Sequence, residues 1–196
     1  MSLTQECRAI ILGTMLGDAC LERNGRYVRL RVDHGEAQRA LVEWKFRQLA
    51  ELNPSPPRRV EVHDDRTNRV YVHYRFTTRS LEILNEYRDL FYTDQGVKRI
   101  HPRILSHLSS ALSIAVWYMD DGSRRGDCRS GYFNTQAFAK EEVDLLRFGL
   151  LKYCNLSTKT HFAAGRPRIY VPVKQFPLLC RLIENHVIPE MQYKLL

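Results

Sequence analysis

Two aspartates that follow similar apolar runs are the residues best suited to chemistry. Asp18 ends the run at 10–17 (IILGTMLG), and Asp121 ends the run at 115–120 (AVWYMD). The two acids stand 103 positions apart in a chain of 196 residues. Because the C-terminal end of a helix carries partial negative charge, an acid there costs stability unless a cation compensates it. The pattern predicts a duplicated helix with a cation near each acid.

The small residues in these runs indicate how the acids meet. We expect the two helices to pack against each other through Gly13, Gly17 and Ala115. Their C-terminal ends then bring Asp18 and Asp121 close together. Adjacent carboxylates repel unless they are protonated or bridged by a metal, and oxygen ligands favour a hard cation such as Mg²⁺. The alternative is a pair of solvated helix ends, which the duplication of the apolar run argues against.

The first half of the chain contains the elements that position Asp18. Residues 4–16 are predicted to form a helix with Thr4 as its N-cap. Strict alternation over 27–33 predicts a strand with its charged residues on one face. The other predicted elements are a helix over 35–52, a hairpin of strands 59–63 and 69–76 around a turn at 64–68, and a helix over 80–91.

The predicted helix over 35–52 has an apolar face at helical spacing, formed by Ala40, Leu41, Trp44 and Leu49. Within it, residues 43–45 (EWK) have the Glu-x-Lys form of a different class of nuclease. They fall in mid-helix, with no acid on a neighbouring strand beside them. We therefore interpret them as part of a solvated helix face.

The second half repeats this order of elements. The strings at 69–72 (RVYV) and 168–171 (RIYV) are nearly identical at an offset of 99 residues. Each half is too small to bury much apolar surface alone, so the two must share a core. The sequence predicts an α+β fold of two αββαββα halves, 1–95 and 96–196. The elements expected after Asp121 are a strand over 130–138, a helix over 140–154, a hairpin of strands 156–162 and 168–173, and a helix over 176–186.

The composition favours a polyanionic partner. A net charge of +8 and a pI near 9.4 point to nucleic acid first and to an anionic membrane only second. Of the 30 basic residues, 23 are Arg, whose bidentate hydrogen bonds suit guanine and phosphate. The alternative explanation of this bias is the codon usage of a GC-rich genome.

The cysteines and the hydropathy indicate the cellular compartment. The five cysteines are odd in number and show no C-x-x-C spacing, so we expect reduced, structural thiols. No apolar run reaches the roughly 20 residues that span a bilayer, and the N-terminus does not resemble a signal peptide. We expect an intracellular protein in a DNA-containing compartment, either a prokaryotic cytoplasm or an organelle matrix, with no membrane partner.

The two acidic runs resemble the signature helices of the LAGLIDADG homing endonucleases. Residues 11–19 (ILGTMLGDA) and 115–122 (AVWYMDDG) match the monomeric, two-motif, intron-encoded branch of that family. The likeness extends over nearly the whole chain, including the tail at 188–195 (IPEMQYKL). Two positions depart from the pattern: Ala19 stands where the signature has glycine, and Val116 stands at the place of Gly13.

The resemblance implies a set of catalytic residues. Asp18 and Asp121 would hold catalytic divalent metal, and the backbone carbonyls of Gly17 and Asp120 would complete the coordination. The family implies Mg²⁺, with Mn²⁺ as the alternative and Ca²⁺ as a substitute that does not support cleavage. It also implies a basic residue near each acid. The matching residues are Lys98, with the adjacent Arg99 as its alternative, and Lys194.

The resemblance also implies an architecture and an activity. Two antiparallel four-stranded sheets would form a pseudo-twofold saddle over double-stranded DNA around the two packed helices. A monomer would cut both strands of a long, asymmetric site and leave 3′ overhangs. Strand periodicity leaves these residues on faces open to the DNA: Arg29, Arg31, Arg69, Tyr71, His73, Arg75, Asn134, Gln136, Arg168 and Tyr170.

The rival function is a non-cleaving nucleic-acid binder, either an intron RNA maturase or a DNA-binding regulator. Both would keep the saddle and the basic charge. Binding alone gains nothing from carboxylates that face phosphate, so the presence of both acids and both lysines favours the nuclease.

Overall fold

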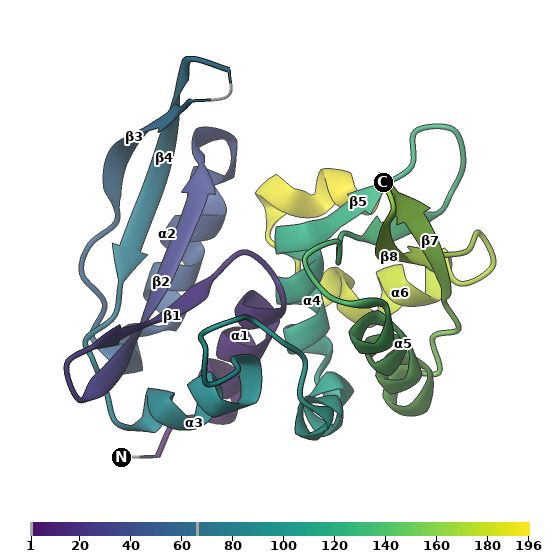
Figure 1. Ribbon diagram of the computed structural model, residues 1–196. Helices are drawn as coiled ribbons and strands as arrows, with labels where there is room; N and C mark the ends of the chain where they lie inside the picture. The colour runs from purple at the N-terminus through teal and green to yellow at the C-terminus, as the bar shows by residue number, and fades with distance from the viewer. Residues whose placement is uncertain (1, 66) are drawn as a thin grey trace. The chain divides into compact units, whose positions relative to one another are not determined.

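Two compact units, Met1–Arg88 and Asp89–Leu196, make up the chain in the computed structural model, which describes residues 2–65 and 67–196. Each unit contains one four-stranded antiparallel sheet with helices packed on it (Figure 1). The strand orders are β1-β2-β4-β3 and β5-β6-β8-β7, so both units have the same topology. The α+β class and the two duplicated sheets are confirmed.

Unit one follows the predicted order of elements. Thr4 caps the first helix, because its hydroxyl accepts a hydrogen bond from the Cys7 amide at 3.2 Å. Residue 66, in the expected turn at 64–68, lies outside the described residues. The elements are α1 (Gln5–Leu16), β1 (Cys20–Asn24), β2 (Tyr27–Gly35), α2 (Arg39–Gln48), β3 (Arg58–Asp64), β4 (Arg69–Thr77) and α3 (Ile83–Phe91), and the last of these crosses the boundary between the units.

The buried face of α2 differs from the predicted one. Leu41, Lys45 and Leu49 are fully buried, whereas Trp44 is only half-buried. Leu41, Lys45 and Leu49 are spaced four residues apart and so lie on one face of the helix. The interpretation of Lys45 as part of a solvated helix face is therefore wrong.

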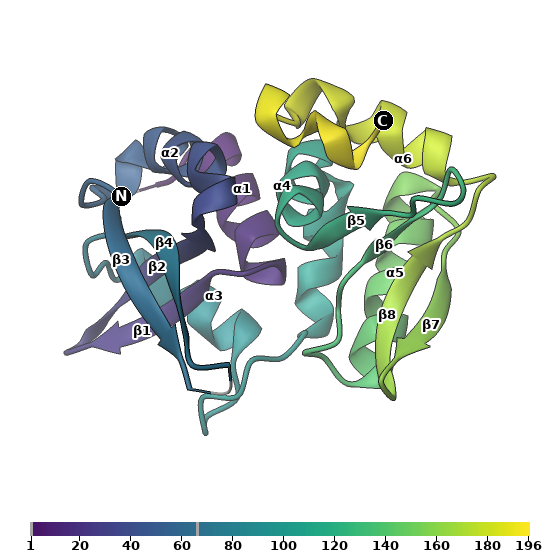
Figure 2. The same ribbon diagram turned by 90° about the horizontal axis from the view of Figure 1, so that it is seen from above.

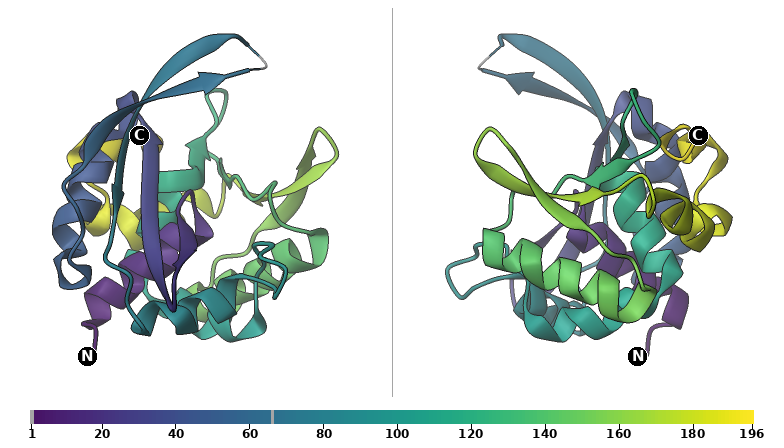
Figure 3. Two further views of the ribbon diagram at one scale, coloured as in Figure 1. Left: turned by 60° about the vertical axis from the view of Figure 1, so that its left-hand side comes forward. Right: turned by 90° about the vertical axis from the view of Figure 1, so that its right-hand side faces the viewer.

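The hairpin of β3 and β4 extends beyond the part of β4 that pairs with β2. Only the segment His73–Thr77 of β4 pairs with β2, whereas β3 pairs with β4 along its whole length from Asp64 to Arg58. The outer half of the hairpin is therefore a two-stranded ribbon that extends beyond β2 (Figure 3). Val70 is 58% exposed as a result.

Unit two has the same succession after a 3₁₀ segment. In both units the helix between the two hairpins covers one face of the sheet: α2 packs on β2 and β4, and α5 packs on β7 and β8 (Figure 2). The elements are the 3₁₀ helix Pro102–Ser109, α4 (Ala111–Asp121), β5 (Gly122–Arg124), β6 (Gly131–Phe133), α5 (Lys140–Cys154), β7 (Lys159–Ala163), β8 (Arg166–Val171), α6 (Phe176–Ile183) and the 3₁₀ helices Glu184–His186 and Pro189–Lys194.

The strand expected over 130–138 ends at Phe133. The chain then turns, with the Phe138 amide donating to the carbonyl of Thr135 at 3.0 Å. It must turn here because α5 begins at Lys140, where Glu142 caps the helix by accepting a hydrogen bond from the Ala139 amide at 2.7 Å. Gln136 consequently lies in a turn and not on a strand face.

The five cysteines are all free thiols, as expected. Burial raises the pKa of Cys7 to about 12 and that of Cys154 to about 11, so both thiols stay protonated at neutral pH. Within the described residues, no helix combines the length and the apolar character needed to cross a bilayer.

The end of α4 leaves no room for a side chain at Gly122. A Cβ there would overlap both the carbonyl oxygen and the ring of Tyr118. We expect Gly122→Ala to lower the free energy of unfolding by about 1–3 kcal/mol, the usual cost of overpacking, in urea denaturation. Gly126→Ala is the matched control, because a Cβ at Gly126 meets nothing within 4 Å. Equal stability of the two variants would show that Gly122 is not packed closely against Tyr118 at the end of α4.

Candidate active site and nucleic-acid interface

Asp18 lies just beyond the end of α1. The helix ends at Leu16, and the Gly17 amide still donates to the carbonyl of Gly13 at 3.2 Å. The chain then departs from helical geometry, so Asp18 is not within the helix itself. Its side chain is 44% exposed, and its Oδ2 lies 3.4 Å from Nδ1 of His34. Asp18 is thus open to solvent on one side and held by a buried imidazole on the other.

Two further side chains contact His34 inside unit one, and a third contacts one of them. Gln38 places Oε1 3.1 Å from His34 Nδ1, and Lys45 places Nζ 3.2 Å from His34 Nε2. The same ammonium donates to Oγ1 of Thr14 at 2.6 Å. Thr14 lies on α1, one turn before Asp18. The sequence analysis missed these residues, although the four-residue spacing of Leu41, Lys45 and Leu49 places Lys45 on the apolar face of α2.

Asp121 is placed differently, as the last residue of α4. It is half-buried, and the neighbouring Asp120 is 5% exposed. Asn134 donates to the carbonyl of Asp121 twice, from its backbone amide at 2.9 Å and from its Nδ2 at 2.8 Å. The end of α4 is therefore fixed through its backbone.

Lys194 provides the cation that an acidic helix end requires. Its buried ammonium donates to the carbonyl of Met119 at 2.6 Å and to that of Asp120 at 3.1 Å. These carbonyls belong to the last turn of α4, where the partial negative charge is greatest. Lys194 also lines an opening of about 370 Å³ together with Arg124 and Arg125, which gives this end of the unit a positive rim.

Lys98 lies in unit two, in the segment after α3. Its ammonium lies 6.0 Å from the ring centroid of Phe138. Asp18 belongs to unit one, so its pairing with Lys98 stays a prediction, as does the approach of Asp18 to Asp121.

The open face of the first sheet is a network of acids and bases. The carboxylate of Glu22 pairs with Arg29 at 2.9 Å and with Arg31 at 2.5 Å. Asp33 pairs with Arg75 and also contacts Nδ1 of His73, at 2.7 and 2.9 Å. Arg69 and Tyr71 lie on the same face of β4, further along the hairpin.

This arrangement confirms that the basic residues of β2 and β4 share a face, as alternation predicted. Glu22 was missed because β1 was not recognised. The dipeptide Asn24-Gly25 is typical of a tight hairpin and was the available signal, since Gly25 has a φ of +65°.

The open face of the second sheet carries an aromatic cluster. Tyr170 stacks on His161 with ring centroids 4.2 Å apart, and Tyr132 contacts both rings at a tilt, 5.2 Å from Tyr170 and 5.9 Å from His161. The guanidinium of Arg168 lies 3.7 Å above the Tyr132 ring. Burial, with a further contribution from Arg168, lowers the pKa of His161 and favours a neutral imidazole. Arg168 and Tyr170 were expected on this face; Tyr132 and His161 are additions.

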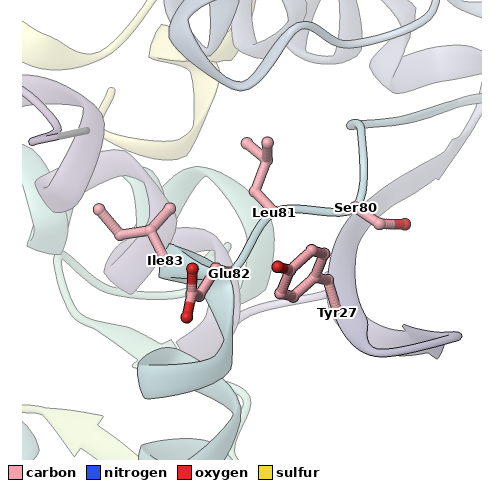
Figure 4. Close-up of a pocket in the computed structure, with 5 residues that line it drawn as sticks. All are labelled: Tyr27, Ser80, Leu81, Glu82 and Ile83. Carbon is pink, nitrogen blue, oxygen red and sulfur yellow. The ribbon is translucent and has the colours of Figure 1, made fainter.

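A pocket of about 490 Å³ in unit one has neither Asp18 nor Asp121 in its lining. Figure 4 shows its lining side chains, which come from the start of β2 and from the segment that leads into α3. They are Tyr27, Ser80, Leu81, Glu82 and Ile83, and none of them was a predicted site residue.

The residues around the acids have the donor chemistry of a hard divalent cation. Mg²⁺ is usually bound by one or two carboxylates together with water and substrate phosphate. Asp18 and Asp121 are both accessible and offer oxygen donors, as do the carbonyls of Gly17 and Asp120. The described residues contain no group of three or more acids, histidines and cysteines placed to hold a metal by themselves.

Duplicated αββαββα units with an acid at the end of each apolar helix define a two-motif LAGLIDADG protein. The model of the LAGLIDADG DNA endonuclease family matches residues 8–179. The chain belongs to this family.

Relatives and a solved structure agree with this assignment. A probable intron-encoded endonuclease 1 of Wickerhamomyces canadensis is 29% identical over 191 residues, which cover 95% of this chain and 82% of the relative. The cytochrome b mRNA maturase bI2 of Saccharomyces cerevisiae is 25% identical over 98% of this chain and 48% of the maturase. The homing endonuclease I-WcaI, solved bound to its DNA recognition sequence, has a TM-score of 0.91 and 27% identity over 100% of this chain and 88% of that chain.

Removing the Lys194 ammonium should destabilise unit two. Lys194→Met leaves the carbonyls of Met119 and Asp120 without a buried charged donor, which we expect to cost about 2 kcal/mol of unfolding free energy. Urea denaturation measures this cost, and Lys152→Met, which removes an exposed ammonium from α5, is the control. A stability equal to that of the control would show that Lys194 does not cap α4.

Proposed function

We propose that this protein is a site-specific homing endonuclease that hydrolyses one phosphodiester in each strand of double-stranded DNA with the help of divalent metal. The observation that carries the proposal is the pair of signature helices, each followed or ended by an acid that is at least partly accessible. Family membership and the similarity to a DNA-bound homing endonuclease support the same reaction.

The acids and the lysines have distinct roles in this proposal. Asp18 and Asp121, with the carbonyls of Gly17 and Asp120, would hold Mg²⁺ or Mn²⁺, whereas Ca²⁺ would bind without supporting cleavage. When bound, the metal supplies a Lewis acid and an activated water at the phosphate. Lys194 fixes the carbonyl of Asp120 and the end of α4. Lys98 would screen the charge that develops on the phosphate.

The open faces of the two sheets would read the DNA. Arginine suits guanine, and asparagine or glutamine suits adenine, in the major groove. The acids on the first sheet hold the guanidinium groups in fixed directions, whereas the second sheet offers aromatic surface. We infer that the two half-sites differ and that a monomer cuts a long, asymmetric site with 3′ overhangs. The proposed contact residues on the strands are Arg29, Arg31, Arg69, Tyr71, His73, Arg75, Arg168 and Tyr170, and those in the segment after β6 are Asn134 and Gln136.

Selection from a randomised DNA library is the experiment that tests this function. Duplexes that the protein linearises in Mg²⁺ are recovered and sequenced. We expect a single long consensus without a twofold axis, and ends with 3′ overhangs. Recovery of bound but uncut duplexes in both Mg²⁺ and Mn²⁺ would refute the nuclease.

Loss of either acid should abolish double-strand cleavage. Asp18→Asn and Asp121→Asn keep the shape of the side chain but remove the charge that holds a divalent cation. We expect no linear product from the selected site in Mg²⁺, and undiminished DNA binding in a gel-shift assay. Asp94→Asn, at an exposed position, is the control and should cut like the wild type. Unchanged cleavage by both acid variants would overturn the assignment of the acids.

Binding to the selected DNA should weaken steeply with salt. Each neutralised phosphate releases counterions, so a protein with about 6–10 phosphate contacts loses about 10³–10⁵ in affinity between 50 and 200 mM salt. Fluorescence anisotropy across this range measures the slope. A slope near zero would contradict the use of the basic faces for DNA.

A second candidate function is RNA maturation, and the bI2 maturase relative favours it. A maturase would use the same basic faces to bind a structured intron RNA. Its signature in the same assays is tight RNA binding and no cleavage of DNA from the intronless allele of its host gene.

A further inference from the structure

A buried polar chain leads from the core of unit one to Asp18. The Nζ atom of Lys45 lies 2.6 Å from Oγ1 of Thr14 and 3.2 Å from Nε2 of His34. His34 in turn places Nδ1 3.4 Å from Oδ2 of Asp18. Lys45 and Thr14 are fully buried, and the side chain of His34 is 1% exposed. The chain connects α2, β2 and α1, so three elements of the unit meet behind one carboxylate.

The donor and acceptor roles along this chain follow from the chemistry of its groups. His34 Nδ1 faces two acceptor oxygens, those of Asp18 and Gln38, so Nδ1 carries the ring proton. Nε2 is then an acceptor and requires a donor. The Lys45 ammonium has three N–H groups and no lone pair, so it supplies that donor. In the contacts that link Lys45 to His34 and His34 to Asp18, the donor is therefore on the side of Lys45.

A lysine is a costly way to fill this position. Burying a charge is unfavourable unless its surroundings compensate it, and the contacts of the Lys45 ammonium include the Thr14 hydroxyl and the His34 ring. Apolar residues occupy the equivalent positions one turn before and one turn after it, Leu41 and Leu49. A charged residue on an otherwise apolar helix face lowers stability, and such residues are expected at functional sites.

We propose that His34 and Lys45 are positioning residues for Asp18. Lys45 fixes His34 in the tautomer that is protonated on Nδ1, and that N–H holds the carboxylate in the orientation in which it binds divalent metal. The metal-binding part rests on the proposed function. In unit two, Lys194 and Asn134 donate to backbone carbonyls at the end of α4.

The tautomer can be tested without any cleavage assay. Long-range ¹H–¹⁵N spectra of the full chain labelled with ¹⁵N-histidine distinguish protonated from unprotonated ring nitrogens, and His34→Asn identifies the His34 signals. We expect Nδ1–H in the wild type, and an Nε2 signal that shifts in Lys45→Met as the donor is lost. Lys152→Met should leave both signals in place. A wild-type ring protonated on Nε2 alone, or an Nε2 signal that Lys45→Met does not move, would overturn the proposal.

The effect on Asp18 is tested on the selected DNA under single-turnover conditions. We expect Lys45→Met and His34→Leu to slow cleavage about 10–100-fold, the usual effect of losing the group that orients a metal ligand. Their Kd for DNA in Ca²⁺ should equal that of the wild type, and so should the rate of Lys152→Met.

Partial rescue separates positioning from a merely structural role. The amide nitrogen of His34→Asn stands in for Nδ1, so this variant keeps a donor to Asp18 while losing the contact with Lys45. We expect it to cut faster than His34→Leu. Equal rates for His34→Asn and His34→Leu, or a loss of DNA affinity that accounts for the slower cleavage, would overturn the positioning role. If the wild-type protein cuts no DNA, the proposed function is refuted. The ¹H–¹⁵N spectra would still show whether His34 is protonated on Nδ1 and contacts Lys45.

Discussion

An apolar helix that ends beside a carboxylate concentrates negative charge at a poorly solvated point, and each unit of this protein is built around that constraint. In unit two, the ammonium of Lys194 binds the last carbonyls of α4 directly. In unit one, the helix ends before Asp18, and a buried imidazole stands beside the carboxylate with Lys45 behind it. A buried lysine is therefore part of both helix ends.

The two units differ in their sheets. Both have the same strand order, so the duplication is evident in the topology. On the first sheet, Glu22 and Asp33 hold arginines in ion pairs, whereas aromatic rings cluster on the second. Ion pairs restrict the directions of guanidinium groups, and stacked rings present a flatter, less polar surface. The two sheets thus share a strand order but present different side chains, which suits a DNA site whose halves differ in sequence.

The elements were predictable where local signals are strong. The cap at Thr4, the alternation in β2 and the helix over 140–154 follow from spacing and capping chemistry alone. The burial of Lys45 was not predicted, because a charged residue was assigned to solvent although its spacing from Leu41 and Leu49 put it inside. Gln136 was misplaced because the turn that starts α5 overrides strand alternation. The acids were identified from their duplication, whereas the residues that hold them depend on tertiary contacts that no local pattern encodes.

We propose that Asp18 and Asp121 hold divalent metal at the phosphates to be cut. A crystal structure of the protein with its selected DNA and Mn²⁺, analysed by anomalous scattering, locates that metal. We expect anomalous peaks within bonding distance of both carboxylates and of a DNA phosphate. With DNA in place, no peak at either acid, or Mn²⁺ bound only elsewhere, would contradict it.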